Sequence, residues 1–185
     1  MLRELKISIL MLLTLTILTG IIYPFSITLI TQILFPYQAN GSLIVKNKNI
    51  IGSKLIGQSF TEAKYFHSRP SESDYNALKS GGSNLGPTSK MLINKIKSNS
   101  IKLQNENVNS SIPIDLVTES ASGLDPQITP EAARFQIPRI AKAQNLSEEK
   151  ILELIKKHTE HKLLGIFGEE RVNVLILNLA LNEKE

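Results

Sequence analysis

Hydrophobic positions concentrate near the start of the chain, in an uncharged run from Ile7 to Leu34. Only Ser, Thr, Gly, Pro and a single Gln interrupt its apolar and aromatic side chains. As a helix these 28 residues extend about 42 Å, whereas the hydrocarbon core of a bilayer is about 30 Å thick. In lipid a single helix satisfies its own backbone hydrogen bonds. The pattern therefore predicts one transmembrane helix over residues 7–34.

Two other interpretations of this run are less favourable. A cleaved signal peptide has an apolar core of about 7–15 residues and a small-residue cleavage site, whereas this run is longer and ends at Pro36–Asn40. A buried helix of a soluble protein is rarely apolar on all sides over such a length. An uncleaved membrane anchor fits best, and we expect Pro24 to kink its helix.

The charges that flank the run predict its orientation. Arg3 and Lys6 precede it, and the next positive charge is Lys46. Because positive residues stay on the cytoplasmic side, we expect residues 1–6 in the cytoplasm and residues 35–185 outside it.

After the anchor, the pattern changes to short strand-like and helix-like stretches, which predict one extracytoplasmic α/β domain of mixed α+β content, with helices flanking a mixed sheet. Thr129 is a good N-cap, with Pro130 at the first helical position, and Ser147 is another, with Leu146 placed to pack on Ile151. The expected strands are 43–45, 50–52 and 112–118; the expected helices are 89–103, one from 130 that Pro138 interrupts and one from 148; the run 171–181 fits a strand or a helix.

Composition adds a few constraints. The formal net charge is +4, and it is +3 beyond the anchor's flank, with the lysines scattered along the chain. This charge is too mild and too dispersed to indicate nucleic-acid binding. The chain has no cysteine, which excludes a disulfide framework and thiolate chemistry.

A glycine-rich stretch is the first candidate for chemistry. From Gly81 to Gly86 the spacing matches a phosphate-binding P-loop, but Pro87 replaces the lysine that such a loop needs. The change removes both a positive charge and a backbone donor. A structural turn or a partner-docking loop is therefore favoured over direct contact with a nucleotide. The residues of this candidate loop are Ser80, Gly81, Gly82, Ser83, Asn84 and Gly86.

The histidines give weaker signals. His158 and His161 are spaced to share a metal ion, but no third ligand can be named, so the sequence predicts no metal site. His67 lies near Ser68 and Ser71, and a base beside either serine suggests an anchored hydrolase; spacing supplies no acid partner, and a structural histidine is favoured. No catalytic residue is assigned.

Two charged positions elsewhere have structural explanations. We expect Asp125 and Pro126 to form a turn. We expect Arg69 and Arg134 to be ion-paired.

Four segments stand out in order along the chain: YFHSRPS (65–71), SGGSNLGP (80–87), SGLDPQITP (122–130) and GEERVNVL (168–175). Together they closely resemble the C subunit of the Kdp potassium-transporting P-type ATPase. The resemblance includes the single N-terminal span and extends over nearly the whole chain, with Gln127 and Glu170 departing from the family's usual His and Pro.

The resemblance implies an accessory subunit of an inner-membrane, ATP-driven potassium uptake complex. The implied partners are a channel-like potassium-binding subunit, a P-type ATPase subunit and a small single-span subunit. The implied role is to raise the ATPase subunit's affinity for ATP, with the Ser80–Gly86 loop as the suspected contact; ATP is implied by resemblance alone. The candidates for the partner interface are His67, Arg69, Asp125 and Arg171.

The implied ATP contact conflicts with the predicted topology, because ATP is scarce outside the cytoplasm. We give the topology more weight, since a loop without its lysine is a weaker signal than two flanking charges. Any effect on ATP is then indirect. A hydrolase that uses His67, and an adaptor for an unrelated transporter, are the alternative functions.

Overall fold

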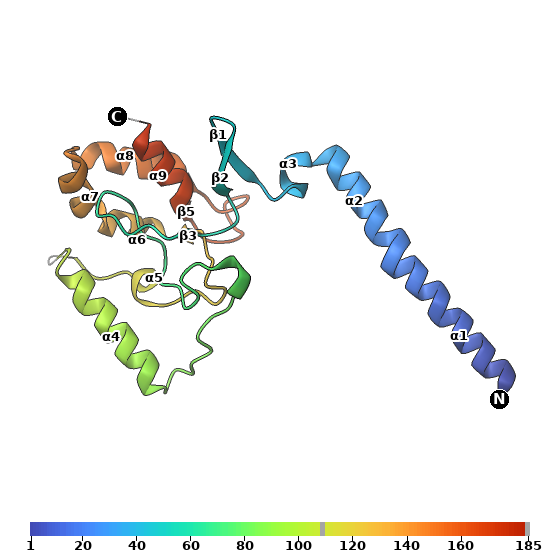
Figure 1. The fold of residues 1–185 in the computed structure, drawn as a ribbon. Helices are drawn as coiled ribbons and strands as arrows, with labels where there is room; N and C mark the ends of the chain where they lie inside the picture. Colours follow the sequence, from blue (N-terminus) through green and yellow to red (C-terminus); the bar gives the residue numbers. More distant parts are fainter. Residues whose placement is uncertain (108–109, 184–185) are drawn as a thin grey trace. The chain divides into compact units, whose positions relative to one another are not determined.

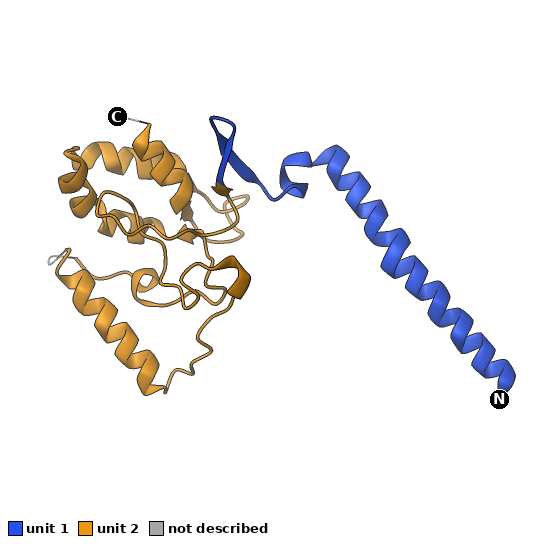
Figure 2. Cartoon of the chain, in the orientation of Figure 1, with its two compact units in different colours: residues 1–51 blue, residues 52–185 orange. Residues whose placement is uncertain are grey.

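The computed structural model describes residues 1–107 and 110–183, and the chain divides into two compact units (Figure 2). The first, here the anchor unit, is Met1–Ile51, and the second, here the body, is Gly52–Glu185. The anchor unit is mostly helical, whereas the body combines helices with a small sheet. An apolar helix followed by a mixed body is the fold class that the sequence predicts.

A nearly continuous helix forms most of the anchor unit. It consists of α1 (Leu2–Ile17), a π-helical turn (Leu18–Ile22) and α2 (Tyr23–Leu34). Taken together, Leu2–Leu34 is long and apolar enough to cross a membrane, and none of it is buried within the protein. The helix thus begins five residues before the predicted run.

The π-helical turn lies immediately before Pro24. Proline has no N–H, and its ring clashes with the carbonyl four residues earlier in a regular α-helix. A π-helical turn is a known cause of helix distortion. This one occurs where the sequence predicts a kink. Four hydroxyl groups in and after this region donate to carbonyls four residues earlier, which hides them from an apolar medium; they belong to Thr19, Ser26, Thr28 and Thr31.

A short helix and a β-hairpin follow the long helix. The helix is α3 (Pro36–Ala39), and strands β1 (Leu43–Lys46) and β2 (Asn49–Ser53) pair in a two-stranded sheet. Asn47 and Lys48 both have positive φ, as a two-residue hairpin turn requires. The two predicted strands and their turn are confirmed.

The sheet of the body has three short strands in the order β3–β5–β4, all antiparallel. They are β3 (Gln127–Ile128), β4 (Thr159–Glu160) and β5 (Arg171–Asn173). Val172, at the centre of β5, is opposite Ile128 on one side and Thr159 on the other. The sheet is antiparallel throughout, whereas the sequence predicted a mixed one.

The hydrophobic core lies between this sheet and the helices near it. The helices of the body are α4 (Lys90–Gln104), α5 (Ile114–Val117), α6 (Pro130–Phe135), α7 (Ile137–Gln144), α8 (Glu148–His158) and α9 (Val174–Asn182), with a 3₁₀ turn at Ala77–Lys79. Figure 1 shows α6, α7, α8 and α9 gathered around the sheet, while α4 lies to one side, next to α5. Helix α8 packs against α6, α7 and α9.

Local signals predict most of these helices correctly. Thr129 Oγ1 accepts a hydrogen bond from Ala132 N, and Pro138 marks the break between α6 and α7. Ser147 is the N-cap of α8 by position but makes no capping hydrogen bond through its side chain, whereas Leu146 packs on the core as expected. Helix α4 begins after Ser89, as the pattern predicts.

The strand predicted over residues 112–118 is wrong. Residues Ile114–Val117 form the single helical turn α5, in which the side chains of Leu116 and Val117 are buried. The Asp115 carboxylate accepts a hydrogen bond from Thr129 N, which ties this turn to the start of α6. The ambiguous run 171–181 forms both structures, first strand β5 and then helix α9.

Candidate functional site

The segment 63–67 has no helix or strand, and buried amide side chains bind its backbone. Asn178 of α9 accepts from Phe66 N at 2.8 Å and donates to Phe66 O at 3.0 Å. Gln136, between α6 and α7, does the same for His67, at 2.8 and 3.1 Å. Each amide thus takes the place of a neighbouring strand, and both amide side chains are almost fully buried.

Arg139 of α7 extends this set of contacts. Its Nη1 donates to the carbonyls of Ala63 (2.6 Å) and Tyr65 (3.0 Å), and its Nη2 donates to Gln136 Oε1 (2.7 Å). Burial lowers the pKa of Arg139, and the carboxylate of Glu106, 3.0 Å from Nε, counteracts this effect. The charged guanidinium therefore holds two carbonyls of the segment and the side chain of Gln136, which itself binds His67.

His67 does not form the base–serine pair that a hydrolase needs. Its Nε2 lies 3.1 Å from Glu62 O. Ser71 Oγ donates to Gly123 O at 2.7 Å and accepts from Tyr75 N. In the described residues the two groups are thus used in separate contacts, which fits the structural interpretation of this histidine.

The glycine loop packs against the loop at 120–123. Gly81 N donates to Ser122 O at 2.8 Å, and Ser80 Oγ donates to the same oxygen at 3.0 Å. A Cβ on Gly82 would lie 2.9 Å from Ala121 O. Gly123 has φ +69°, and a Cβ on it would lie 2.8 Å from Gly81 O. These glycines allow two backbones to touch, which is a different task from surrounding a phosphate.

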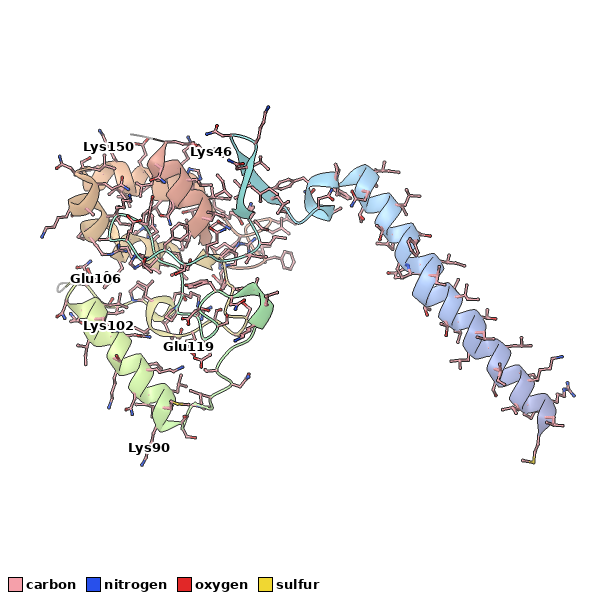
Figure 3. All side chains as sticks on the ribbon, in the orientation of Figure 1. Lys46, Lys90, Lys102, Glu106, Glu119 and Lys150 are labelled. Carbon is pink, nitrogen blue, oxygen red and sulfur yellow. The ribbon has the colours of Figure 1, made fainter. Side chains whose placement is uncertain are left out.

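The charges beside this loop are mostly paired. Lys95 Nζ, on α4, donates hydrogen bonds to the carboxylates of Glu72 and Glu119, the latter at 2.9 Å. Burial raises the pKa of Glu119, but hydrogen bonds from Lys95 and Ser83 outweigh it, so the pKa lies below its usual value and the group is ionised. Figure 3 labels Glu119 on the side of the body that faces α4. A carboxylate beside Ser83 is unfavourable for a phosphate ligand.

Three of the four predicted partner-interface residues lie together. Arg69, Asp125 and Arg171 line one hollow of about 210 Å³ at the edge of the sheet. Arg69 Nη1 lies 3.3 Å from Asp125 Oδ2, and Arg171 Nε lies 3.1 Å from Glu160 Oε2. Both arginines are thus held by carboxylates at a polar, open surface.

The fourth candidate, His67, lines a separate hollow of about 190 Å³ with Lys102, Glu106 and Gln136. Lys102 and Glu106 are labelled in Figure 3 at the C-terminal end of α4.

The sequence also predicts an ion pair at Arg134 and a turn at Asp125, and it places His158 and His161 at the spacing of two metal ligands. Arg134 Nη1 lies 3.7 Å from Glu131, and Asp125 Oδ1 accepts from Gln127 N, which confirms the predicted pair and turn. His161 Nδ1 lies 2.7 Å from Glu170 Oε1. Within residues 1–107 and 110–183, no three metal-ligating side chains gather in one place.

Sequence reasoning missed the buried amides and one exposed apolar hairpin. Asn178 interrupts the apolar run 174–181, and Gln136 lies at the junction of two helices. A polar residue within an apolar run or at a helix junction is the signal that could have identified them. The second feature, at residues 163–167, has four large apolar side chains exposed to solvent.

Comparison with known proteins gives one consistent family. The family model described as "KdpC: K+-transporting ATPase, c chain" matches residues 5–183. The chain is 53% identical to the potassium-transporting ATPase KdpC subunit of Bradyrhizobium diazoefficiens and 52% identical to that of Rhodopseudomonas palustris strain BisB18, each over 98% of both proteins. It is 48% identical to the KdpC subunit of Methylobacterium nodulans, over 99% of this chain and 98% of that one.

We predict that Gly123→Ala destabilises the body, because the new Cβ meets Ser73 Oγ at 2.6 Å on a backbone with positive φ. We expect the free energy of unfolding to fall by about 1–3 kcal/mol in urea titrations of the detergent-solubilised chain. Gly86→Ala is the matched control, since its Cβ enters open space, and a change within about 0.5 kcal/mol is expected. Equal stability of the two variants would contradict the packing role of Gly123.

A second prediction concerns pH. Burial, and then the charge of Arg139, lower the pKa of His67 below its ordinary 6.5. The unfolded chain, with His67 at its ordinary pKa, therefore binds more protons as pH falls below about 6.5, and stability is lost in that direction. We expect the melting temperature to fall between about pH 7.5 and 5.5, and to fall less in His67→Gln. His161→Gln, at an exposed histidine, is the control; an equal pH slope in wild type and His67→Gln would disprove the assignment.

Proposed function

This chain belongs to the KdpC family, the c chains of K+-transporting ATPases, and from that premise we propose that its body works outside the cytoplasm as a non-catalytic stabiliser of the complex. The chain is a subunit of a potassium-transporting ATPase, and its apolar N-terminal helix suggests membrane anchoring.

The proposed topology has residues 1–6 in the cytoplasm, residues 7–34 in the membrane and residues 35–185 outside. Arg3 and Lys6 support it, because they precede the helix and no positive charge follows until Lys46. The helix that begins at Leu2 is compatible with this arrangement, since both charged residues then lie in its first two turns, near the membrane surface.

The proposed partners are the channel-like potassium-binding subunit, the P-type ATPase subunit and the small single-span subunit. We propose that the body caps the external mouth of the potassium-binding subunit. The hollow lined by Arg69, Asp125 and Arg171 supports a docking role, because charged groups already held by intramolecular partners can meet a polar protein surface at little cost in ordering.

The proposed effect on ATP is indirect: a docked subunit raises the nucleotide affinity of the ATPase subunit by coupling through the complex. Two observations favour this proposal over direct contact. Gly81 N–H of the suspected loop is bonded to Ser122 O, and Ser83 faces an ionised Glu119. A phosphate would find an occupied donor and a like charge in this loop.

We predict that the glycine loop is accessible from outside the cell. Gly86→Cys adds the only thiol of the chain at an exposed position whose Cβ enters open space. We expect a membrane-impermeant maleimide to label it in intact cells, because the body lies beyond the membrane. Glu4→Cys, on the other side of the anchor, is the control and should react only after permeabilisation. The reverse pattern would overturn the topology and revive direct contact with cytoplasmic ATP.

We predict that removal of residues 36–185 weakens both assembly and potassium affinity. Recovery of the other subunits with the truncated chain in mild detergent should fall by about tenfold, since the proposed docking surface is lost. The potassium concentration that half-saturates ATPase activity in membranes should rise. The full chain carrying Gly86→Ala serves as the control for expression. If assembly and potassium affinity both stay at wild-type values, the capping proposal fails.

A further inference from the structure

The chain between α8 and β5 forms a hairpin, and its apolar turn, residues Leu163–Phe167, is called the hairpin tip. Its four large side chains are among the exposed apolar groups of the body: Leu163 is 70% exposed, Leu164 81%, Ile166 75% and Phe167 62%. In Figure 1 this part of the chain leaves the cluster of helices as a loop. Contiguous apolar side chains on a surface mark a place where another molecule binds.

The tip is a formed structure. Leu163 and Phe167 exchange both backbone hydrogen bonds, at 2.8 and 3.0 Å, and Gly165 N donates to Lys162 O. Leu164 has φ +54° and Gly165 has φ +74°. Four of its five backbone N–H groups, all but that of Leu164, are bonded within the turn, so the tip can enter an apolar environment with few donors left unpaired. A preformed loop also loses little conformational freedom on binding.

Leu164 shows that the tip does little for the fold of the body itself. A leucine with positive φ is unfavourable, and its exposed side chain gains no compensating burial within the described chain. An unfavourable conformation that presents an apolar side chain to solvent is easier to explain by a contact with a second molecule.

The charges around the tip indicate which kind of molecule this is. The segment 160–171 carries the three carboxylates of Glu160, Glu169 and Glu170 against the two cations of Lys162 and Arg171. Lys162 pairs with Glu169 at 3.1 Å. Anionic lipid attracts clusters of lysine and arginine, which this segment lacks. An apolar centre with a rim of charged groups of both signs instead matches the organisation of protein–protein contacts.

We infer that the hairpin tip is an apolar anchor that inserts into an apolar pocket on the external surface of the potassium-binding subunit, which the body is proposed to cap. This inference rests on the proposed function, because it assigns the docking contact that the proposal requires. The tip adjoins the hollow lined by Arg69, Asp125 and Arg171, since Glu169, Glu170 and Arg171 follow the tip in sequence and line that hollow. The apolar anchor and the polar hollow together form one continuous surface.

The first test compares two double variants in the intact complex. Leu164→Ser with Ile166→Ser removes the tip's apolar surface, and Leu78→Ser with Ile101→Ser removes equally exposed but separate side chains (94% and 67%). Both should melt like the wild-type chain, because no buried group changes. We expect recovery of the partner subunits in mild detergent to fall about tenfold for the tip variant and to stay within about twofold for the control. Wild-type recovery of the tip variant would overturn the inference.

The second test identifies the occupant and does not depend on the stability of the serine variants. Phe167→p-benzoylphenylalanine keeps a large aromatic group at the tip, and Leu78→p-benzoylphenylalanine is the matched control. After irradiation of the whole complex we expect a covalent adduct of this chain with the potassium-binding subunit from the tip only. Adducts with another subunit or with lipid alone, or no adduct from the tip, would overturn the inference.

The two proposals fail separately. If truncation of residues 36–185 abolishes assembly while the tip variant assembles normally, the proposed function stands and the hairpin inference is wrong. If the tip forms an adduct with a partner while truncation leaves assembly and potassium affinity unchanged, the tip docks but the body does not stabilise the complex.

Discussion

The body depends on two buried carboxamides that replace a missing strand. Residues 63–67 cross the face of the helices without regular structure, and Asn178 and Gln136 bond the N–H and C=O groups of Phe66 and His67. A buried backbone group without a partner costs about 1–3 kcal/mol. Loss of Asn178 would leave two such groups in the core, and loss of Gln136 would leave the two part-buried groups of His67 without a partner. Because Phe66 is fully buried, this segment also fills the core, and the loops that follow it are held in place from there.

The glycine loop shows how one pattern can serve two different tasks. A phosphate-binding loop and a close backbone crossing both need residues without Cβ, since a side chain would block the approach in either case. What separates them is the use of the N–H groups and the nearby charge. Here Gly81 N–H is bonded to Ser122 O, and Lys95 is shared between Glu72 and Glu119. The missing lysine at Pro87 was therefore the more informative part of the motif.

The sequence predicts features whose causes are local and misses those whose causes are distant. The apolar run, the Thr129 cap and the break at Pro138 depend on neighbouring residues, and all three appear in the structure. The apolar stretch 112–118 was assigned as a strand because burial alone does not separate a strand from a helical turn; the bond from Thr129 N to Asp115 belongs to the turn. The run 171–181 divides at Asn173, whose side chain accepts from Ile176 N and starts α9.

For the candidate site, the same distinction holds. The sequence identified Arg69, Asp125 and Arg171, but only the fold brings them to one hollow, because β3 and β5 pair across a separation of 44 positions at the Ile128–Val172 register. The amide contacts of Asn178 span 112 positions, and no local pattern predicts them.

The family places this body in an ATP-driven complex, and the structure limits how it can influence ATP. A subunit that binds two conformations of its partner equally well shifts neither, however tightly it binds. If the body touches no nucleotide, its influence requires a docking surface that contacts one conformation of the complex better than the other. The pairs formed by Arg69 and Arg171 suit such a contact, because a charged group can exchange an intramolecular carboxylate for one on a partner with little change in solvation. The apolar tip carries no charge, so its contact does not depend on how charges are arranged on the partner. Conformational preference would then come from the polar hollow, and affinity from the tip.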